Sequence, residues 1–150
     1  MTLTKNVTDT LNGIIQSIKN VIPLSVTTSS PTLLNQPVNQ HSIGVLIGVT
    51  GDFRGRIIID GEEVAFQALG TTMFGMPLEG EMLESFAGEL GNMLAGNLAT
   101  QVSQAGHIID ITPPTVIVGT TKMYGFDKAL QLPIQVDQVG EMTITLMIQE

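Results

Sequence analysis

The order of hydrophobic patterns along the chain limits the folds that it can adopt. A helical pattern comes first, a β-hairpin pattern follows, then two helical patterns, and four β-type runs complete the sequence. Parallel α/β folds need strands and helices to alternate, because a crossover between parallel strands usually contains a helix. The order found here does not alternate. We therefore expect an α+β fold, with a largely antiparallel sheet of about six strands that carries an N-terminal helix and two central helices.

The separate elements follow from the spacing of their apolar residues. From Val7 to Ile22 these residues recur every three or four positions, which is typical of an amphipathic helix, and Pro23 ends it. Residues 25–41 are rich in Ser, Thr, Asn, Gln and Pro, so we expect a loop or an irregular edge segment there. Pro113 and Pro114 are expected to interrupt a strand, because proline has no N–H to donate. The other expected elements are a hairpin of strands 42–50 and 54–60, helices at about 61–74 and 79–104, and strands 107–111, 116–118, 129–136 and 141–148.

Composition and charge narrow the possible functions. A chain of 150 residues, of which 43% are hydrophobic, supports one domain (residues 1–150) with a substantial core. The net charge of −8 repels phosphate backbones and anionic lipids, so we expect neither nucleic-acid binding nor membrane binding. The absence of cysteine excludes disulfides and cysteine-based zinc sites, and it fits a cytoplasmic protein.

The expected helix 79–104 contains an unusual concentration of glycine. Gly88, Gly91 and Gly96 fall within nine residues, and each costs roughly 1 kcal/mol relative to alanine in a helix interior. Close approach of another surface would offset that cost. On a helical wheel Glu89 and Asn92 project the same way, one turn apart. The residues alone leave two interpretations open: an ordinary solvated surface, or a contact face with an acid and an amide.

The helical wheel also divides the remaining side chains of this helix. The face that carries Glu89 and Asn92 continues through Ser85, Gly96 and Ala99, and these three together with Gly88 become candidate partner-binding residues. The opposite side is expected to face the core, and it comprises Met82, Leu83, Phe86, Leu90, Met93, Leu94 and Leu98. A strip with so few side chains suits a protein partner better than an enclosed small substrate.

Several motifs in the expected order resemble the CheX branch of the CheC/CheX family of chemotaxis phosphatases. They are the segment 88–96 (Gly-Glu-Leu-Gly-Asn-Met-Leu-Ala-Gly), the segment 109–116 with Gly119, the glycine-rich hairpin 44–55 and the segment 132–134. Together they cover most of the chain from about residue 42 onwards. Only one E-x-x-N motif is present where CheC-type relatives carry two, which favours the CheX type. The segment Asp9-Thr-Leu-Asn12 is partly similar to the motif, and we attribute this similarity to chance.

The resemblance implies a phosphatase that acts on the phosphoaspartate of a CheY-type receiver domain. Glu89 and Asn92 would be the catalytic pair: Asn92 positions the attacking water, and Glu89 pairs with the receiver's active-site lysine. No cofactor or metal is expected on this chain, whereas Mg²⁺ is expected in the receiver. The resemblance also implies a homodimer joined through β-sheets. The alternative is a non-catalytic module that binds a receiver or a component of the flagellar switch.

Other candidate residues fit structural roles better than catalytic ones. His41 lies in a polar segment, His107 at the edge of a β-run, and Asp110 before a proline turn, where a carboxylate commonly hydrogen-bonds the backbone. The acidic residues show no grouping typical of a metal site. The eight methionines are expected to fill gaps in the core.

Overall fold

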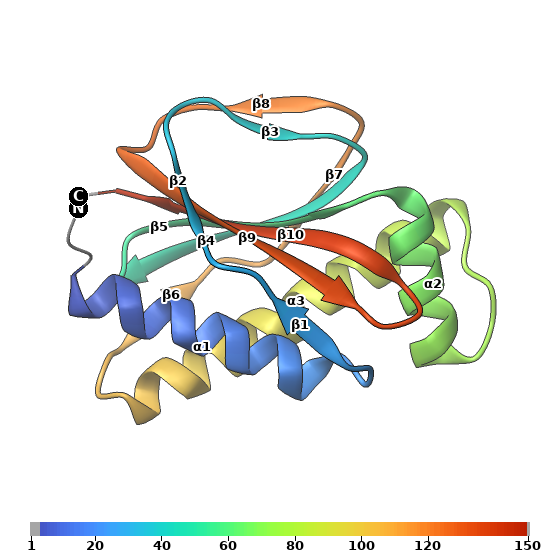
Figure 1. Cartoon of the computed structure of the whole chain (residues 1–150), viewed down its shortest axis with the longest axis horizontal. Helices are drawn as coiled ribbons and strands as arrows, with labels where there is room; N and C mark the ends of the chain where they lie inside the picture. The colour runs from blue at the N-terminus through green and yellow to red at the C-terminus, as the bar shows by residue number, and fades with distance from the viewer. Residues whose placement is uncertain (1–3, 150) are drawn as a thin grey trace.

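The computed structural model describes residues 4–149, and residues 1–3 and 150 lie outside the described part. The described residues form three helices and ten strands (Figure 1). The helices are α1 (Lys5–Val21), α2 (Glu63–Phe74) and α3 (Gly80–Gln104). The strands are β1 (Val26–Thr28), β2 (Thr32–Leu34), β3 (Val38–Gln40), β4 (Ile43–Gly51), β5 (Gly55–Gly61), β6 (Ile109–Ile111), β7 (Thr115–Val118), β8 (Thr121–Met123), β9 (Lys128–Val136) and β10 (Gly140–Ile148). The expected α+β fold is confirmed.

The main sheet is antiparallel and six strand positions wide, in the order β1-β9-β10-β5-β4-β6. At one edge β1 and β2 follow each other along β9, and at the other edge β6 and β7 follow each other along β4. Eight strands therefore occupy six positions. Both expected hairpins are confirmed, because β4 pairs with β5 and β9 pairs with β10.

The sequence-based assignment missed four short strands. Residues 25–41, expected as a loop or an irregular edge segment, contain β1 and β2 at the edge of the main sheet and also β3, and the strand β8 had not been expected at all. Each of these strands is only three residues long, and all but β2 are mostly polar, so no hydrophobic alternation marks them. Their pairing partners decide their conformation: β9 orders β1 and β2, and β3 and β8 form a separate two-stranded sheet.

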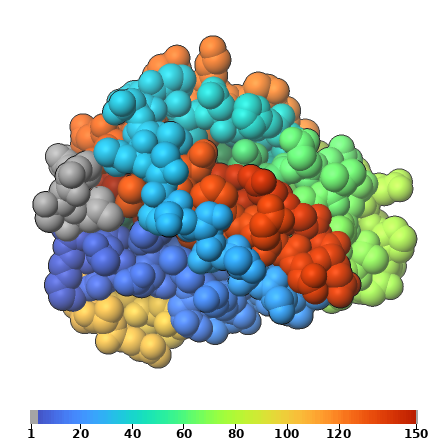
Figure 2. All heavy atoms as spheres, viewed as in Figure 1, coloured from blue at the N-terminus to red at the C-terminus, as the bar shows by residue number. Residues whose placement is uncertain are grey.

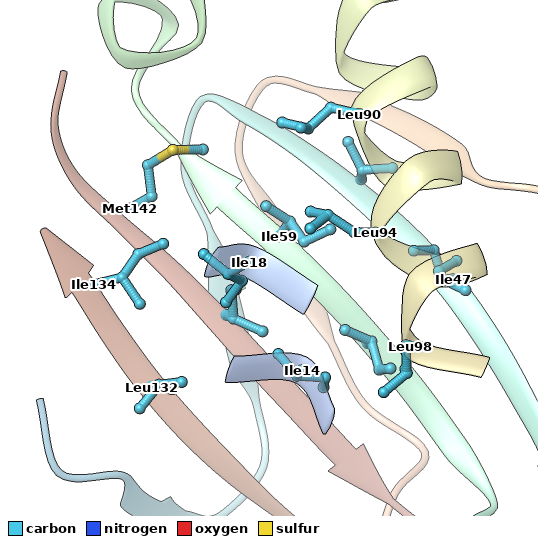
Figure 3. Packing of buried hydrophobic residues seen from close by; sticks show 14 of the residues in the cluster. Ile14, Ile18, Ile47, Ile59, Leu90, Leu94, Leu98, Leu132, Ile134 and Met142 are labelled. Carbon is cyan, nitrogen blue, oxygen red and sulfur yellow. The ribbon is translucent and has the colours of Figure 1, made fainter. Parts of the chain in front are cut away.

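The sheet separates two apolar layers. The helices α1 and α3 cover one face, and the β3–β8 pair lies over the other (Figure 1). The main core lies between the helices and the sheet, where side chains from α1, α3 and the four long strands interdigitate (Figure 3). A smaller cluster lies under β3 and β8 and includes Val38, Ile58, Met123, Phe126 and Met147. Ile58 belongs to the smaller cluster while Ile57 and Ile59 belong to the main core, as the alternation of a strand requires.

The helix α1 forms part of the outer wall of the molecule. In the space-filling view it lies against the C-terminal end of α3, and β1, β2 and the β9–β10 hairpin continue the same surface above it (Figure 2). Its N-cap is Thr4, whose hydroxyl accepts a hydrogen bond from the Val7 N–H. The apolar stripe predicted from Val7 to Ile22 is the side that enters the core. None of the helices among residues 4–149 is both long and apolar enough to cross a membrane.

The strand break at Pro113 and Pro114 is confirmed, and it lies directly beside α3. Thr112 bridges the break with two hydrogen bonds to one residue: its hydroxyl accepts from the Gly48 N–H at 2.8 Å, and its N–H donates to the Gly48 carbonyl at 2.9 Å. A side-chain oxygen thus replaces the ladder acceptor that is lost at the break. The edge made by β6 and β7 stays attached to β4, and it provides part of the surface on which α3 rests.

Candidate functional site

The helix α3 is 25 residues long, which corresponds to about 37 Å, and it carries all the candidate site residues. The preceding helix ends at Gly75, whose φ of 73° is left-handed and suits glycine, and a short connection then leads to Gly80. Glu81 lies in the first turn of α3, where a negative charge interacts favourably with the helix dipole. Leu83, Leu90 and Leu98 are each at most 2% exposed and fix the helix on the sheet. The helix therefore offers a firmly held platform.

Glu89 and Asn92 are exposed and lie one turn apart on the outer side of α3. Among residues 4–149 neither side chain has a hydrogen-bond or ion-pair partner. Their immediate neighbours Leu90 and Gly91 are buried, so the backbone that carries the pair is fixed while the two polar groups stay free. An acid and an amide in this state are available to a partner.

Gly88, Gly91 and Gly96 do not all lie on the side of α3 that carries Glu89 and Asn92. This corrects the expectation that they let another surface approach that side. A Cβ placed on Gly91 would come within 2.4 Å of Val45 Cγ1 on β4, and one on Gly88 within 3.3 Å of Val116 Cγ2 on β7. Both positions face the sheet, and they let the helix approach it closely. Of Gly88, Gly91 and Gly96, only Gly96 is exposed with open space around it: no heavy atom of the surroundings lies within 4 Å of a Cβ placed there.

Two methionines and one alanine also differ from the expected wheel. Met82 and Met93 were expected to face the core, but they are 56% and 39% exposed. The wheel places both within about 40° of Glu89, at the border of the apolar side, where only the neighbouring elements decide burial. Ala99, expected on the contact face, is half-buried and packs against the main core. The exposed residues along this side of α3, which we call the site face, are Met82, Ser85, Glu89, Asn92, Met93 and Gly96.

An apolar hollow of about 560 Å³ adjoins the site face. It lies where α2, the connection 75–79 and α3 meet. Its lining is apolar apart from one hydroxyl and two carboxylates, and it consists of Phe74, Met76, Leu78, Glu81, Met82, Ser85, Phe86 and Glu89. The rings of Phe74 and Phe86 meet edge to face at 5.4 Å. The hollow escaped sequence analysis because its residues come from three elements. The Gly75-Met-Pro77 break was the signal that the chain turns here.

The electrostatic character of α3 is uniformly negative. The helix contains Glu81, Glu84 and Glu89, and it contains no lysine or arginine. Glu79 precedes its first turn. A partner that docks on the site face would therefore gain from positive charge around its point of contact.

His107 and the acidic motif on α1 have structural partners. His107 Nε2 lies 2.7 Å from Asp9 Oδ2, and the Lys5 ammonium lies 2.6 Å from the same oxygen. The hydrogen bond from Lys5, and then that from His107, holds the pKa of Asp9 below its ordinary value of 3.8. These contacts tie the start of α1 to the connection after α3. Asp9 thus has partners within the fold, whereas Glu89 has none among residues 4–149. This difference supports the interpretation that the similarity of Asp9-Thr-Leu-Asn12 to the motif is accidental.

The remaining candidates do not gather into a site. Asp110 is exposed on the edge strand β6, and His41 is exposed beside β4. Among residues 4–149 no group of three or more His, Cys, Asp or Glu side chains is arranged to hold a metal ion.

The sequence matches the family model described as "Chemotaxis phosphatase CheX" over residues 43–134. The CheY-P phosphatase CheX of Thermotoga maritima is 32% identical over 143 residues, which cover 93% of this chain and 92% of that protein. Among solved structures, the chemotaxis protein CheX of Desulfovibrio desulfuricans superposes with a TM-score of 0.80 at 16% identity, over 97% of this chain and 100% of that one. A chain in the CheX-CheY-BeF₃-Mg²⁺ complex from Borrelia burgdorferi superposes with a TM-score of 0.79 at 22% identity, over 97% of this chain and 99% of that one.

Proposed function

This chain is a member of the CheX family of chemotaxis phosphatases, and we propose that Glu89 and Asn92 dephosphorylate the phosphoaspartate of a CheY-type receiver domain. One observation carries the assignment of the site. Both side chains project, without partners among residues 4–149, from a helix whose other side is buried in the core. The similar protein of Thermotoga maritima is named a CheY-P phosphatase, which supports the same substrate class here.

In this proposal Asn92 positions the attacking water. A carboxamide both donates and accepts hydrogen bonds, so it can hold a water molecule and aim one of its lone pairs at the phosphorus atom. Hydrolysis of an acyl phosphate needs a water in line with the leaving carboxylate, and positioning supplies much of the rate in phosphoryl transfer. The exposed site face suits this role because the receiver itself closes the reaction centre.

Glu89 fixes the docked geometry. Its free carboxylate can form a charge-assisted hydrogen bond with the active-site lysine of the receiver, which withdraws the lysine from the phosphoryl group. The Mg²⁺ that neutralises the phosphoryl oxygens comes with the receiver. The complex from Borrelia burgdorferi contains CheX, CheY, BeF₃ and Mg²⁺ together, which supports a receiver-borne metal in this protein's reaction.

Phosphate release from a phosphorylated receiver tests the proposal. The wild type is compared with Asn92→Ala and Glu89→Ala, and with Asn12→Ala as a matched control, because Asn12 is another exposed asparagine on a helix. We expect Asn92→Ala to abolish most of the acceleration while it still binds the receiver, and Glu89→Ala to weaken binding as well. Asn12→Ala should behave as the wild type.

The rival function is a module that binds a receiver or a flagellar-switch component without catalysis. A docking surface alone requires no amide at position 92. Receiver dephosphorylation at the same rate with and without the wild-type protein would favour the rival function for that receiver. Full activity of Asn92→Ala would leave the function intact and contradict the mechanism.

We also propose that residues 1–150 act as a single domain, that two copies form a homodimer through their β-sheets, and that the protein works in the cytoplasm. The continuous main core that joins α1, α3 and the long strands supports the first point. For the dimer, β3 and β8 pair only with each other among the described strands, so each has an edge free for a second copy. The cysteine-free composition fits the cytoplasm. Light scattering on the purified protein measures the oligomeric state.

A further inference from the structure

The hollow beside the site face carries apolar surface that the proposed chemistry does not use. Phe74, Met76 and Met82 are 54%, 49% and 56% exposed around it, while Leu78 and Phe86 beneath them are 3% and 2% exposed. Single exposed apolar residues are ordinary on protein surfaces. Three of them around one concave site, over a buried apolar floor, form the kind of patch that marks an interaction surface.

The position of the hollow determines what can cover it. Ser85 and Glu89 belong both to its wall and to the site face. Met82 lies seven residues before Glu89, which is about 10 Å along the helix. A receiver domain of roughly a hundred residues is about 30 Å across. A receiver that presents its phosphoryl group to Glu89 and Asn92 must therefore also cover Met82 and the hollow.

The charges around the hollow specify the character of the matching surface. Glu81 and Glu89 stand at its rim, and α3 offers no positive charge. An apolar side chain would fill the floor, and lysine or arginine beside it would meet the rim. Methionine is flexible and polarisable, so Met76 and Met82 can adjust to the shape of the inserted group.

We propose that this hollow is a docking subsite for the receiver: it takes up an apolar side chain that the receiver carries next to its phosphorylation site, flanked by lysine or arginine. The inference rests on the proposed function and deepens it, because the hollow would select among receivers. Its contacts are the same before and during hydrolysis. They therefore set KM and leave kcat unchanged, whereas Asn92 acts on kcat.

The test uses the double variant Met76→Gln, Met82→Gln. Glutamine has nearly the length of methionine, and at Met82, which lies in α3, it has nearly the same helix propensity, so the change removes apolar character and little else. Met76→Leu, Met82→Leu is the matched variant that keeps the surface apolar. Ile108→Gln removes an even more exposed apolar side chain, 78% exposed, beyond the far end of α3. Circular dichroism and thermal unfolding confirm that each variant is folded.

Two measurements are made with the CheY-type receivers of the source organism. Binding is titrated with receiver that carries beryllofluoride and Mg²⁺, and turnover is followed as phosphate release from phosphorylated receiver. For the glutamine variant we expect Kd and KM to rise about tenfold, equivalent to about 1.4 kcal/mol, with kcat unchanged. Ile108→Gln should match the wild type, and the leucine variant should bind more tightly than the glutamine variant because it keeps the surface apolar. Added salt should raise Kd for all of them.

The outcomes separate this inference from the function on which it rests. An unchanged Kd and KM in the glutamine variant, with Asn92→Ala inactive, would overturn the docking subsite and leave the phosphatase assignment standing. A fall in kcat at constant KM would also overturn it, because the hollow would then act on the chemistry. Failure of the wild type to bind or dephosphorylate any of the receivers would contradict both proposals.

Discussion

At the scale of single residues, the glycines of α3 have two different roles. Gly91 is buried at the contact with β4, where the Val45 side chain leaves no room for a methyl group. Gly96 is exposed with open space around it. The same residue type therefore serves packing at one position and leaves the surface flat at the other. This distinction matters because Gly96, unlike Gly91, can influence how closely a partner approaches the helix.

Alanine substitutions at the two positions should have opposite effects on stability. For Gly91→Ala, the clash with Val45 outweighs the gain in helix propensity of about 1 kcal/mol, and we expect a net loss of about 1–3 kcal/mol. Gly96→Ala meets no obstacle and should raise the free energy of unfolding by about 0.5–1 kcal/mol. Urea denaturation of the two variants measures both values. Greater stability of Gly91→Ala than of the wild type would show that β4 can move away from the helix.

Gly96→Ala also bears on the site face. If the receiver contacts this part of the helix, the added methyl group should lower phosphatase activity although the protein is more stable. Phosphate release at subsaturating receiver concentration is the appropriate measurement. Unchanged activity would place the receiver contact nearer the N-terminal half of α3.

At the scale of elements, a side-chain hydrogen bond bridges the break in the sheet edge beside α3. The strand is interrupted at Pro113 and Pro114, and the Thr112 hydroxyl accepts a hydrogen bond from the Gly48 N–H across the interruption. The next strand, β7, carries Val116, which lies against Gly88 of the helix. The position of α3 on the sheet is thus linked to a strand break that contains no catalytic residue.

Thr112→Val should loosen this edge. The variant keeps the shape of the side chain but removes the acceptor of the Gly48 N–H, so we expect a loss of about 0.5–1.5 kcal/mol. Thr115→Val is the matched control, because Thr115 is an exposed threonine on β7 whose hydroxyl has no partner among the described residues. Hydrogen exchange of the Gly48 amide locates the effect. Equal stability of the two variants would indicate that water replaces the threonine hydroxyl without cost.

At the scale of the whole molecule, one carboxylate opposes folding at neutral pH. Asp60 lies on β5, partly buried, and its Oδ1 has no hydrogen-bond partner within residues 4–149. Burial raises the pKa of Asp60 above its ordinary value of 3.8, and the hydrogen bond from the His41 backbone offsets this only in part. The native state therefore holds the Asp60 proton more tightly than the unfolded state does. The charged form destabilises the protein above the raised pKa, and this cost disappears below pH 3.8, where both states are protonated.

Asp60→Asn should accordingly be more stable than the wild type at pH 7. The expected gain is at most about 1 kcal/mol, because the side chain is partly exposed and solvent screens its charge. The advantage should shrink as the pH falls towards 3.8. Urea denaturation of both proteins at a series of pH values from roughly 3.5 to roughly 7.5 measures the difference. A gain that is independent of pH would show that the charge of Asp60 is not its cause.

Much of this protein follows from its sequence alone. Helical periodicity is local, so it sufficed to place α1 and α3 and to put Glu89 and Asn92 on one exposed side. The order of the elements predicted an antiparallel sheet, and the motif around Glu89 indicated the family to which the chain belongs.

Only the tertiary structure decided which surfaces meet. The strands β1, β2, β3 and β8 have no apolar alternation, and each forms because a partner strand lies beside it. Gly91 faces the sheet and Gly96 faces open space, although both interrupt the same helix. Met82 is exposed because no element covers that side of α3, and the hollow exists because three elements converge there. Local sequence fixes the direction of a side chain on its helix, but burial depends on what the rest of the chain places against it.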